Sequence, residues 1–286
     1  MLDLFRHEFV QNAFLAGTLV AIVSAMVGYF VVLRGQAFAG ETLSHIGFTG
    51  ATGAALLGIP SLYGVFLLTI LAAFGMGALG KRLRGRDVEI GMVLSFMLGL
   101  GVLFLSLYTQ NSTQTVNILF GSILSITHEN VLITLGVTLG SMAILAVIFR
   151  PLLFASIDPA VAEARGVPVH GLSIVFLFLM ATTVSGAVLV VGVLLVFALL
   201  VVPAASAEQI TRRPLATLGL AVAISLVSTW GGLVLAFIGH LPVSFYIVAL
   251  TSMFYFASRL VNHFRNPPHY RQPPHPGKEL IEPPAE

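Results

Sequence analysis

The stretch GETLSHIGFTGATGAALLG, residues 40 to 58, predicts a helix that crosses a bilayer, from its length and apolar composition. It nevertheless carries a carboxylate at Glu41 and an imidazole at His45, four residues apart and therefore on one helical face. Small residues let a neighbouring helix approach closely, and a stripe of them follows helical spacing here: Gly40, Ser44, Gly47, Ala51, Ala54 and Gly58. The stretch therefore predicts a central helix that packs on one side and presents ionisable groups on the other.

The composition of the whole chain extends this picture to a membrane protein. The 286 residues are 57% hydrophobic and 9% charged, with a mean hydropathy of +0.98. Such a chain is far more apolar than a soluble domain needs, so the bilayer must be its solvent. Each crossing takes about 20 residues, which leaves room for eight or nine crossings and for no soluble catalytic domain. The expected fold is an all-α, polytopic membrane helical bundle.

The apolar segments can be placed along the chain. The sixth and seventh could form one bent unit, because Thr182, Thr183, Ser185 and Gly186 interrupt an otherwise continuous run. The first is longer than the core of a signal peptide and should be retained as a span. The expected segments are 12–33, 37–58, 61–80, 89–109, 131–150, 170–184, 186–206, 214–237 and 242–260.

The distribution of positive charge predicts an orientation. With nine crossings, every Lys and Arg except Arg6 falls on one side of the membrane. Cytoplasmic loops are enriched in these residues, so we expect the C-terminus inside and the N-terminus outside. The run from Lys81 to Arg86 is then a topology anchor and not a nucleic-acid patch. Eight spans would require an interfacial N-terminal segment or re-entrant sixth and seventh segments.

Three pieces are not expected to span. Residues 109–130 have a short apolar middle, which suits a re-entrant or surface helix. In residues 154–171, Asp158 can cap a short cytoplasmic helix, Pro159 suits its first position and Gly166 can end it. From Val261 the chain is rich in proline and should be disordered. We therefore divide the chain into a transmembrane domain, 1–260, and a tail, 261–286.

Glu41 and His45 are candidate metal ligands. An unpaired ionised group in lipid costs about 3 kcal/mol on insertion scales, so both should face a partner, water or an ion. The chain has no cysteine, and a carboxylate with an imidazole suits zinc, manganese, iron or nickel and disfavours Cu(I). Two alternatives stay open from the residues alone. The pair could be structural, with Glu41 bonded to a neighbouring helix and His45 packed, or it could relay protons.

Several motifs together resemble a known family. AFAGETLSHIGFTGA (37–51), LFGSILSIT (119–127), DPAVAEARGVPV (158–169) and VGVLLVFALLVVPAASA (191–207) are similar to segments of the permease subunits of zinc/manganese/iron-type ABC importers. The similarity covers roughly residues 10 to 260. It implies a multi-pass protein of a prokaryotic cell membrane that pairs with a second copy of itself. It also implies a cytoplasmic ATPase subunit and an extracytoplasmic metal-binding protein as partners.

The resemblance also implies roles for individual residues. The family has an acid and a histidine on the pathway in its second helix, and Glu41 and His45 match them, with Glu where the family usually has Asp. The short helix resembles the coupling helix that docks into the ATPase, which assigns that role to Asp158, Ala162, Glu163, Arg165 and Gly166.

The implied function is a transport subunit without enzymatic activity of its own. It would bind no permanent cofactor and carry a divalent metal ion as its cargo, with ATP hydrolysed in the separate partner chain. The import direction follows from the resemblance alone. Two rivals are a proton-coupled secondary transporter and an ABC permease for a metal chelate.

Overall fold

A computed structural model of the chain describes residues 8–78, 87–107, 121, 126–239 and 241–265. The secondary structure within these ranges is entirely helical, which confirms the all-α prediction. The helices are α1 (Glu8–Leu33), α2 (Ala37–Leu56), α3 (Ser61–Ala78), α4 (Asp87–Leu107), α6 (His128–Ile157), α7 (Pro159–Ala164), α8 (Val169–Val191), α9 (Val193–Ile210), α10 (Pro214–Ile238) and α11 (Val243–Arg265).

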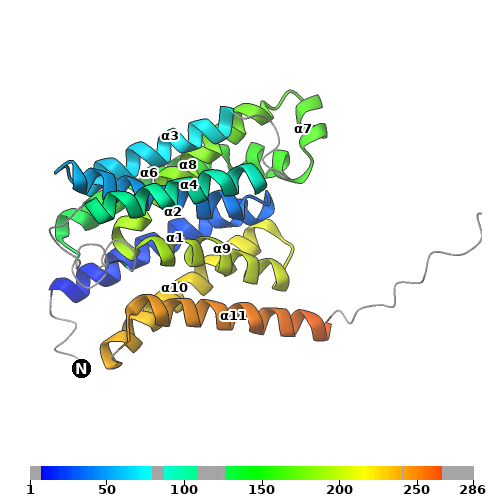
Figure 1. The fold of residues 1–286 in the computed structure, drawn as a ribbon. Coiled ribbons are helices and arrows are strands. Elements are labelled where there is room, and N and C mark those ends of the chain that lie inside the picture. The colour runs from blue at the N-terminus through cyan, green and yellow to red at the C-terminus, as the bar shows by residue number, and fades with distance from the viewer. Residues whose placement is uncertain (1–7, 79–86, 108–120, 122–125, 240, 266–286) are drawn as a thin grey trace, which may run out of the picture.

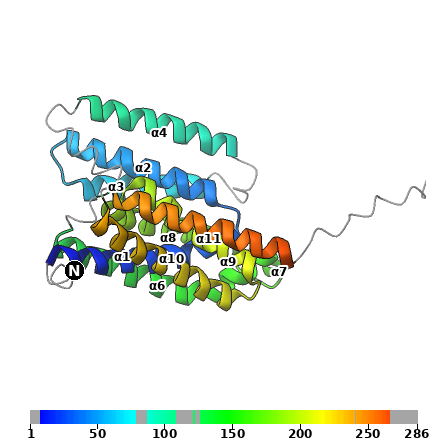
Figure 2. The same ribbon diagram turned by 90° about the horizontal axis from the view of Figure 1, so that it is seen from below.

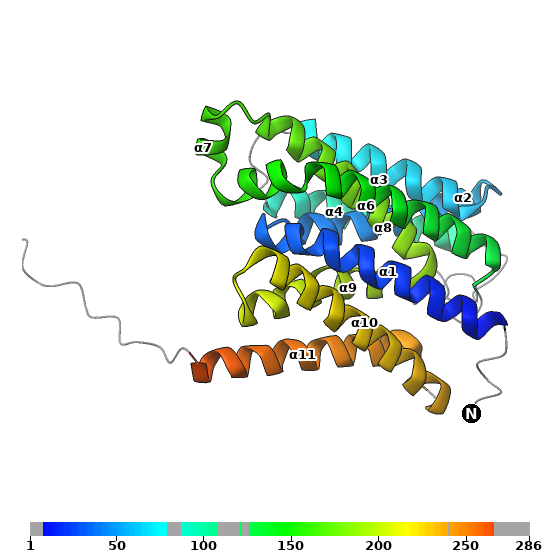
Figure 3. The ribbon, with the colours of Figure 1, turned by 180° about the vertical axis from the view of Figure 1, so that it is seen from behind.

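The long helices lie roughly side by side, and the short helix α7 lies at one end of the bundle (Figure 1). The turn between α1 and α2, the start of α10 and the end of α11 lie at this same end, which we call the α7 end. The described start of α1 lies at the opposite end, as the view from behind also shows (Figure 3). The segments at this end hold Arg34 between α1 and α2, Arg165 directly after α7, and Arg212 and Arg213 directly before α10. The charge count predicts that these residues share one side of the membrane, whereas Arg6 and the run from Lys81 to Arg86 lie outside the described residues.

Seven of the described helices are long and apolar enough to cross a membrane: α1, α4, α6, α8, α9, α10 and α11. The apolar part of α3, Ser61–Gly77, is shorter, and α2 is not among the seven. A multi-pass membrane protein is therefore confirmed. Exposed side chains support it, because large apolar residues such as Phe96 on α4 and Phe256 on α11 are two-thirds exposed, at 66% and 67%. Such faces suit contact with lipid.

The boundary between the sixth and seventh predicted segments is wrong. Helix α8 continues through Ser185 and Gly186 to Val191, and the break falls at Gly192, whose φ is 79°. Ser185 stays inside the helix because its hydroxyl donates to the Ala181 carbonyl and also bonds Thr69 of α3. A positive φ disfavours any residue with a Cβ, so the glycine takes the turn.

The predicted short helix after α6 is confirmed as a local structure. The Asp158 carboxylate accepts a hydrogen bond from the Val161 backbone N–H at 3.0 Å, Pro159 is the first helical residue, and Gly166 has a φ of 82°. The predicted helix in 109–130 lies almost wholly outside the described residues. Helix α11 continues to Arg265, past the predicted start of the tail, and residues 266–286 lie outside the description.

Two helices hold the bundle together. Helix α1 packs against α6, α8, α9 and α10, and helix α2 packs against α3, α4, α8 and α9. Seen from below, α4 lies beside α2 at one side of the bundle (Figure 2). Helix α2 is therefore enclosed by several neighbours, as its sequence predicts.

Candidate metal site on helix α2

The small-residue stripe forms the packed face of α2. Ser44, Ala51 and Ala54 are buried. A Cβ on Gly40 would meet the Leu200 side chain of α9 at 2.9 Å, and one on Gly47 would meet α3 and α8 side chains at 3.6 Å. Gly58 differs, because its φ is 70° and nothing lies near it. The predicted packing stripe is thus confirmed up to Ala54, and Gly58 belongs to the turn that follows.

The closest approach on this face was not predicted. A Cβ on Gly50 would collide with the backbone carbonyl of Gly64 on α3, and one on Gly64 would collide with the Gly50 carbonyl. The two backbones therefore pack directly against each other, which only glycine permits. Gly64 lies near the start of an apolar segment, and its position in the sequence does not predict contact with Gly50.

The other face of α2 carries the ionisable pair. Glu41 and His45 are partly buried, whereas Thr42, Leu43 and Ser44 between them are buried. The two side chains lie one helical turn apart. At about 1.5 Å per residue they sit about 6 Å and 12 Å along the axis from Ala37, in the half of α2 nearer the α7 end. The His45 Nδ1 is buried and has no hydrogen-bond partner among the described residues.

Thr49 and Thr52 follow His45 at helical spacing, but they do not continue this polar face. The Thr49 hydroxyl donates to the Met97 carbonyl of α4 at 2.6 Å, and the Thr52 hydroxyl donates to the Phe48 carbonyl at 3.0 Å. Both side chains are buried. Thr49 therefore joins α2 to α4, whereas the Thr52 bond stays within α2. The polar face is limited to Glu41 and His45.

The described residues of one chain hold no group of three or more His, Cys, Asp or Glu side chains placed to bind a metal. The pair on α2 offers one carboxylate and one imidazole, which suit borderline divalent metals such as manganese, iron and zinc. A closed four-ligand site holds an ion tightly, whereas such an incomplete set would hold it weakly.

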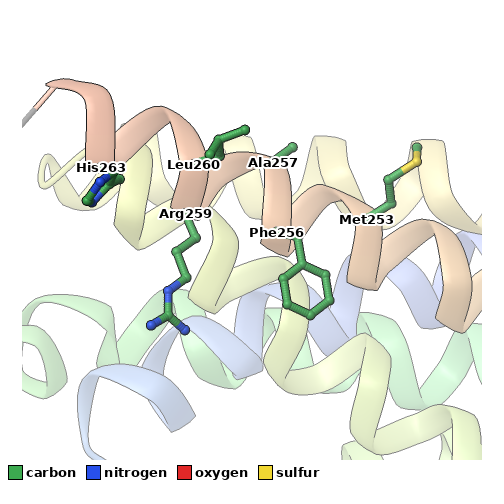
Figure 4. Close-up of a pocket in the computed structure, with 6 residues that line it drawn as sticks. All are labelled: Met253, Phe256, Ala257, Arg259, Leu260 and His263. Atoms are coloured by element: carbon green, nitrogen blue, oxygen red, sulfur yellow. The ribbon is translucent and has the colours of Figure 1, made fainter.

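Two hollows lie elsewhere on the molecule. A polar one at the end of α9 is lined by Glu208, Gln209, Ile210, Thr211, Arg212, Val261 and Asn262. An apolar one on α11 is lined by Met253, Phe256, Ala257, Arg259, Leu260 and His263, and Phe256 and Arg259 project from the same side of the helix (Figure 4). Neither hollow includes Glu41 or His45.

The candidate docking residues are brought together at the α7 end. Asp158, Glu163, Arg165 and Gly166 are exposed. Ala162 differs, because it is fully buried and packs within the chain's own core. The exposed residues can therefore meet a partner, whereas Ala162 holds α7 against the bundle.

A bundle of long apolar helices defines a class of protein, a multi-pass membrane protein. The particular family follows from comparison. The family model described as the ABC 3 transport family matches residues 6–262. The chain belongs to this family and is the membrane permease of an ABC transporter, which excludes the proton-coupled secondary transporter.

The chain is similar to named metal-transport proteins and to a solved structure. It is 30% identical to the "Manganese transport system membrane protein MntC" of Listeria innocua over 90% of this chain and 92% of that protein. It is 30% identical to a "Probable iron transport system membrane protein" of Haemophilus influenzae over 87% of this chain and 96% of that protein. Among solved structures, PsaBC from Streptococcus pneumoniae in complex with Fab matches with a TM-score of 0.81 and 27% identity, over 93% of this chain and 95% of the other.

Proposed function

We propose that this permease imports a divalent transition-metal ion, with manganese as the first cargo to test. The observation that carries the proposal is the Glu41 and His45 pair on the open face of an otherwise closely packed helix. The names of similar proteins support the class of cargo, since they include manganese and iron transport. An oxygen and a nitrogen ligand suit either ion.

The proposed working unit is a symmetric dimer. One chain supplies two ligand side chains on α2, and no larger group lies in its described part. Two chains would supply two carboxylates and two imidazoles, enough for a transient ring around a dehydrated ion. In each chain we propose nine crossings, formed by the seven apolar spans together with α2 and α3, which lie alongside them.

The driving force comes from a separate ATPase subunit that docks on the α7 end. The exposed Asp158, Glu163, Arg165 and Gly166 form the proposed docking surface, and the buried Ala162 fixes its position. An extracytoplasmic metal-binding protein would deliver the ion at the opposite end. ATP binding would then move the helices that line the path between an outward and an inward opening.

The test is metal uptake by proteoliposomes that contain the permease and its ATPase subunit. We expect ATP-dependent uptake of manganese, and competition by iron or zinc would rank the ions. Glu41→Gln keeps the size of the side chain and removes its charge, so uptake should fall at least about tenfold, equivalent to about 1.4 kcal/mol. Glu129→Gln, at an exposed position in the first turn of α6, is the matched control. Unchanged uptake by Glu41→Gln at equal expression would show that the pathway is elsewhere.

A further inference from the structure

Arg34 lies in the turn between α1 and α2 and contacts both helices that flank α7. Its guanidinium donates a hydrogen bond to the Ser156 hydroxyl in the last turn of α6 at 3.3 Å. It donates another to the Ser173 hydroxyl near the start of α8 at 2.6 Å. The same group lies over the Phe176 ring, 5.5 Å from its centroid. One side chain thus bridges the two arms of the α6–α7–α8 segment.

The two serines are oriented to accept these bonds. The Ser156 hydroxyl donates its own hydrogen to the Leu152 carbonyl at 2.6 Å, and the Ser173 hydroxyl donates to the Val169 carbonyl at 2.9 Å. Each hydroxyl has one hydrogen, so its lone pairs remain for the guanidinium. Bonds to a charged donor are stronger than neutral ones, which makes Arg34 a firm connection between three segments.

From Arg34 the chain leads directly into helix α2, which carries the candidate metal ligands. Gly35, with a φ of 66°, closes α1, and the Gln36 N–H donates to the Val31 carbonyl at 2.8 Å. These bonds give α1 a fixed end. Helix α2 begins at Ala37, and Glu41 follows one turn later. A movement of the guanidinium is therefore passed to the start of α2 through a short, hydrogen-bonded turn.

The surroundings of Arg34 differ from those of a simple topology anchor. Such an anchor leaves its charge among lipid headgroups or water, whereas Arg34 is partly buried and its Nε is buried without a partner among the described residues. Its recorded partners in the described part of the chain are two hydroxyls and a ring, with no carboxylate. A partly buried cation thus joins these segments.

We propose that Arg34 is a positioning residue that carries the displacement of the α6–α7–α8 segment to the start of α2. A displacement of α7 relative to the bundle would move Ser156 and Ser173. The guanidinium, which is bonded to both, would then displace the α1–α2 turn. Glu41 and His45 would then change their position relative to the path. This inference rests on the proposed function, because it needs an ATPase that acts on α7 and a metal that is bound on α2.

The test measures metal uptake and ATP hydrolysis in the same proteoliposomes that contain permease and ATPase subunits. Arg34→Met should lower the manganese taken up per ATP hydrolysed by about fivefold or more, the size of a typical coupling between sites. ATP hydrolysis and co-purification of the ATPase should be retained. Arg34→Lys should give an intermediate ratio, because an ammonium lacks the fork that spans both serines. Arg212→Met, an exposed position at the same end, is the control and should keep the wild-type ratio.

The outcomes separate the coupling role from a structural one. If Arg34→Met lowers uptake and hydrolysis in the same proportion, the residue is structural and the inference is wrong. If this variant does not fold, the double variant Ser156→Ala and Ser173→Ala keeps the arginine and removes its acceptors. A lowered ratio in the double variant supports the inference, and an unchanged ratio overturns it. No ATP-dependent uptake by the wild-type complex would overturn the proposed function as well.

Discussion

The two faces of helix α2 share one backbone but have different roles. One face is built from small residues, and at Gly50 it leaves no room for a further methyl group because the Gly64 backbone packs against it. The other carries Glu41 and His45, which are only partly buried. Close packing stabilises the bundle, whereas the ionisable pair contributes nothing obvious to packing. We therefore expect mutations on the packed face to lower stability, and mutations on the face with Glu41 and His45 to lower transport without lowering stability.

The largest effect is expected on the packed face. Gly50→Leu would drive a side chain into the backbone of α3, which cannot yield as a flexible side chain can. We expect a loss of at least about 3 kcal/mol of stability, enough to prevent recovery of folded protein. The measurement is the yield of monodisperse protein after detergent extraction, followed by its thermal unfolding.

Gly58→Ala is the matched control for this variant, because it changes another glycine at the end of the same helix. Nothing lies near Gly58, so the cost is only that of a Cβ at a φ of 70°, about 1 kcal/mol. If Gly58→Ala and Gly50→Leu were equally damaging, the close contact of α2 with α3 would not be the reason.

On the open face, His45→Ala should abolish transport and spare the fold. The buried Nδ1 of the imidazole has no hydrogen-bond partner in the described residues, so removal of the ring breaks no hydrogen bond of that atom. We expect manganese uptake to fall at least about tenfold while the thermal midpoint stays close to that of the wild type. His263→Ala, at an exposed position on α11, should change neither quantity.

A large drop in the thermal midpoint of His45→Ala would contradict the separation of the two faces. It would favour the structural alternative, in which the histidine is a packing residue. Normal uptake with normal stability would instead remove His45 from the path. Both quantities must therefore be measured on the same preparation.

The sequence predicts those features whose causes are local or compositional. Hydropathy predicts a membrane bundle, and the capping pattern at Asp158 predicts α7, because the carboxylate and the N–H it accepts from are three residues apart. Features that depend on a distant partner were missed. Ser185 was interpreted as a break, but its hydroxyl is satisfied within α8 and by α3. Arg34 was counted only as a positive charge, since Ser156 and Ser173 lie far along the chain.

A smaller effect is expected at α7 itself. Asp158→Ala removes the side-chain acceptor for the Val161 N–H and should destabilise this short helix by about 1 kcal/mol. The bundle should remain intact, because α7 contributes few of its contacts. We expect weaker co-purification of the ATPase subunit and lower uptake. Asp158→Asn, which can still cap, should recover most of the loss.

If Asp158→Ala left the association with the ATPase and the uptake unchanged, the docking surface would lie elsewhere on the α7 end. A loss of uptake with full association would instead point to coupling after docking. Either result tests α7 without disturbing α2.

The smallest effect is expected from Glu41→Asp, which keeps the charge and shortens the side chain by one methylene. The resemblance to the importer permeases implies the shorter acid at this position, so the variant should fold and transport. Moving the carboxylate back by about one bond length changes its reach toward an ion held jointly with His45, and ions with different preferred geometries respond differently. We expect the uptake ratio of manganese to zinc to change by about threefold, less than 1 kcal/mol, at nearly constant stability. Competition assays with both ions measure this ratio. An unchanged ratio would mean that the Glu41 carboxylate does not contact the ion directly, even if its charge is required.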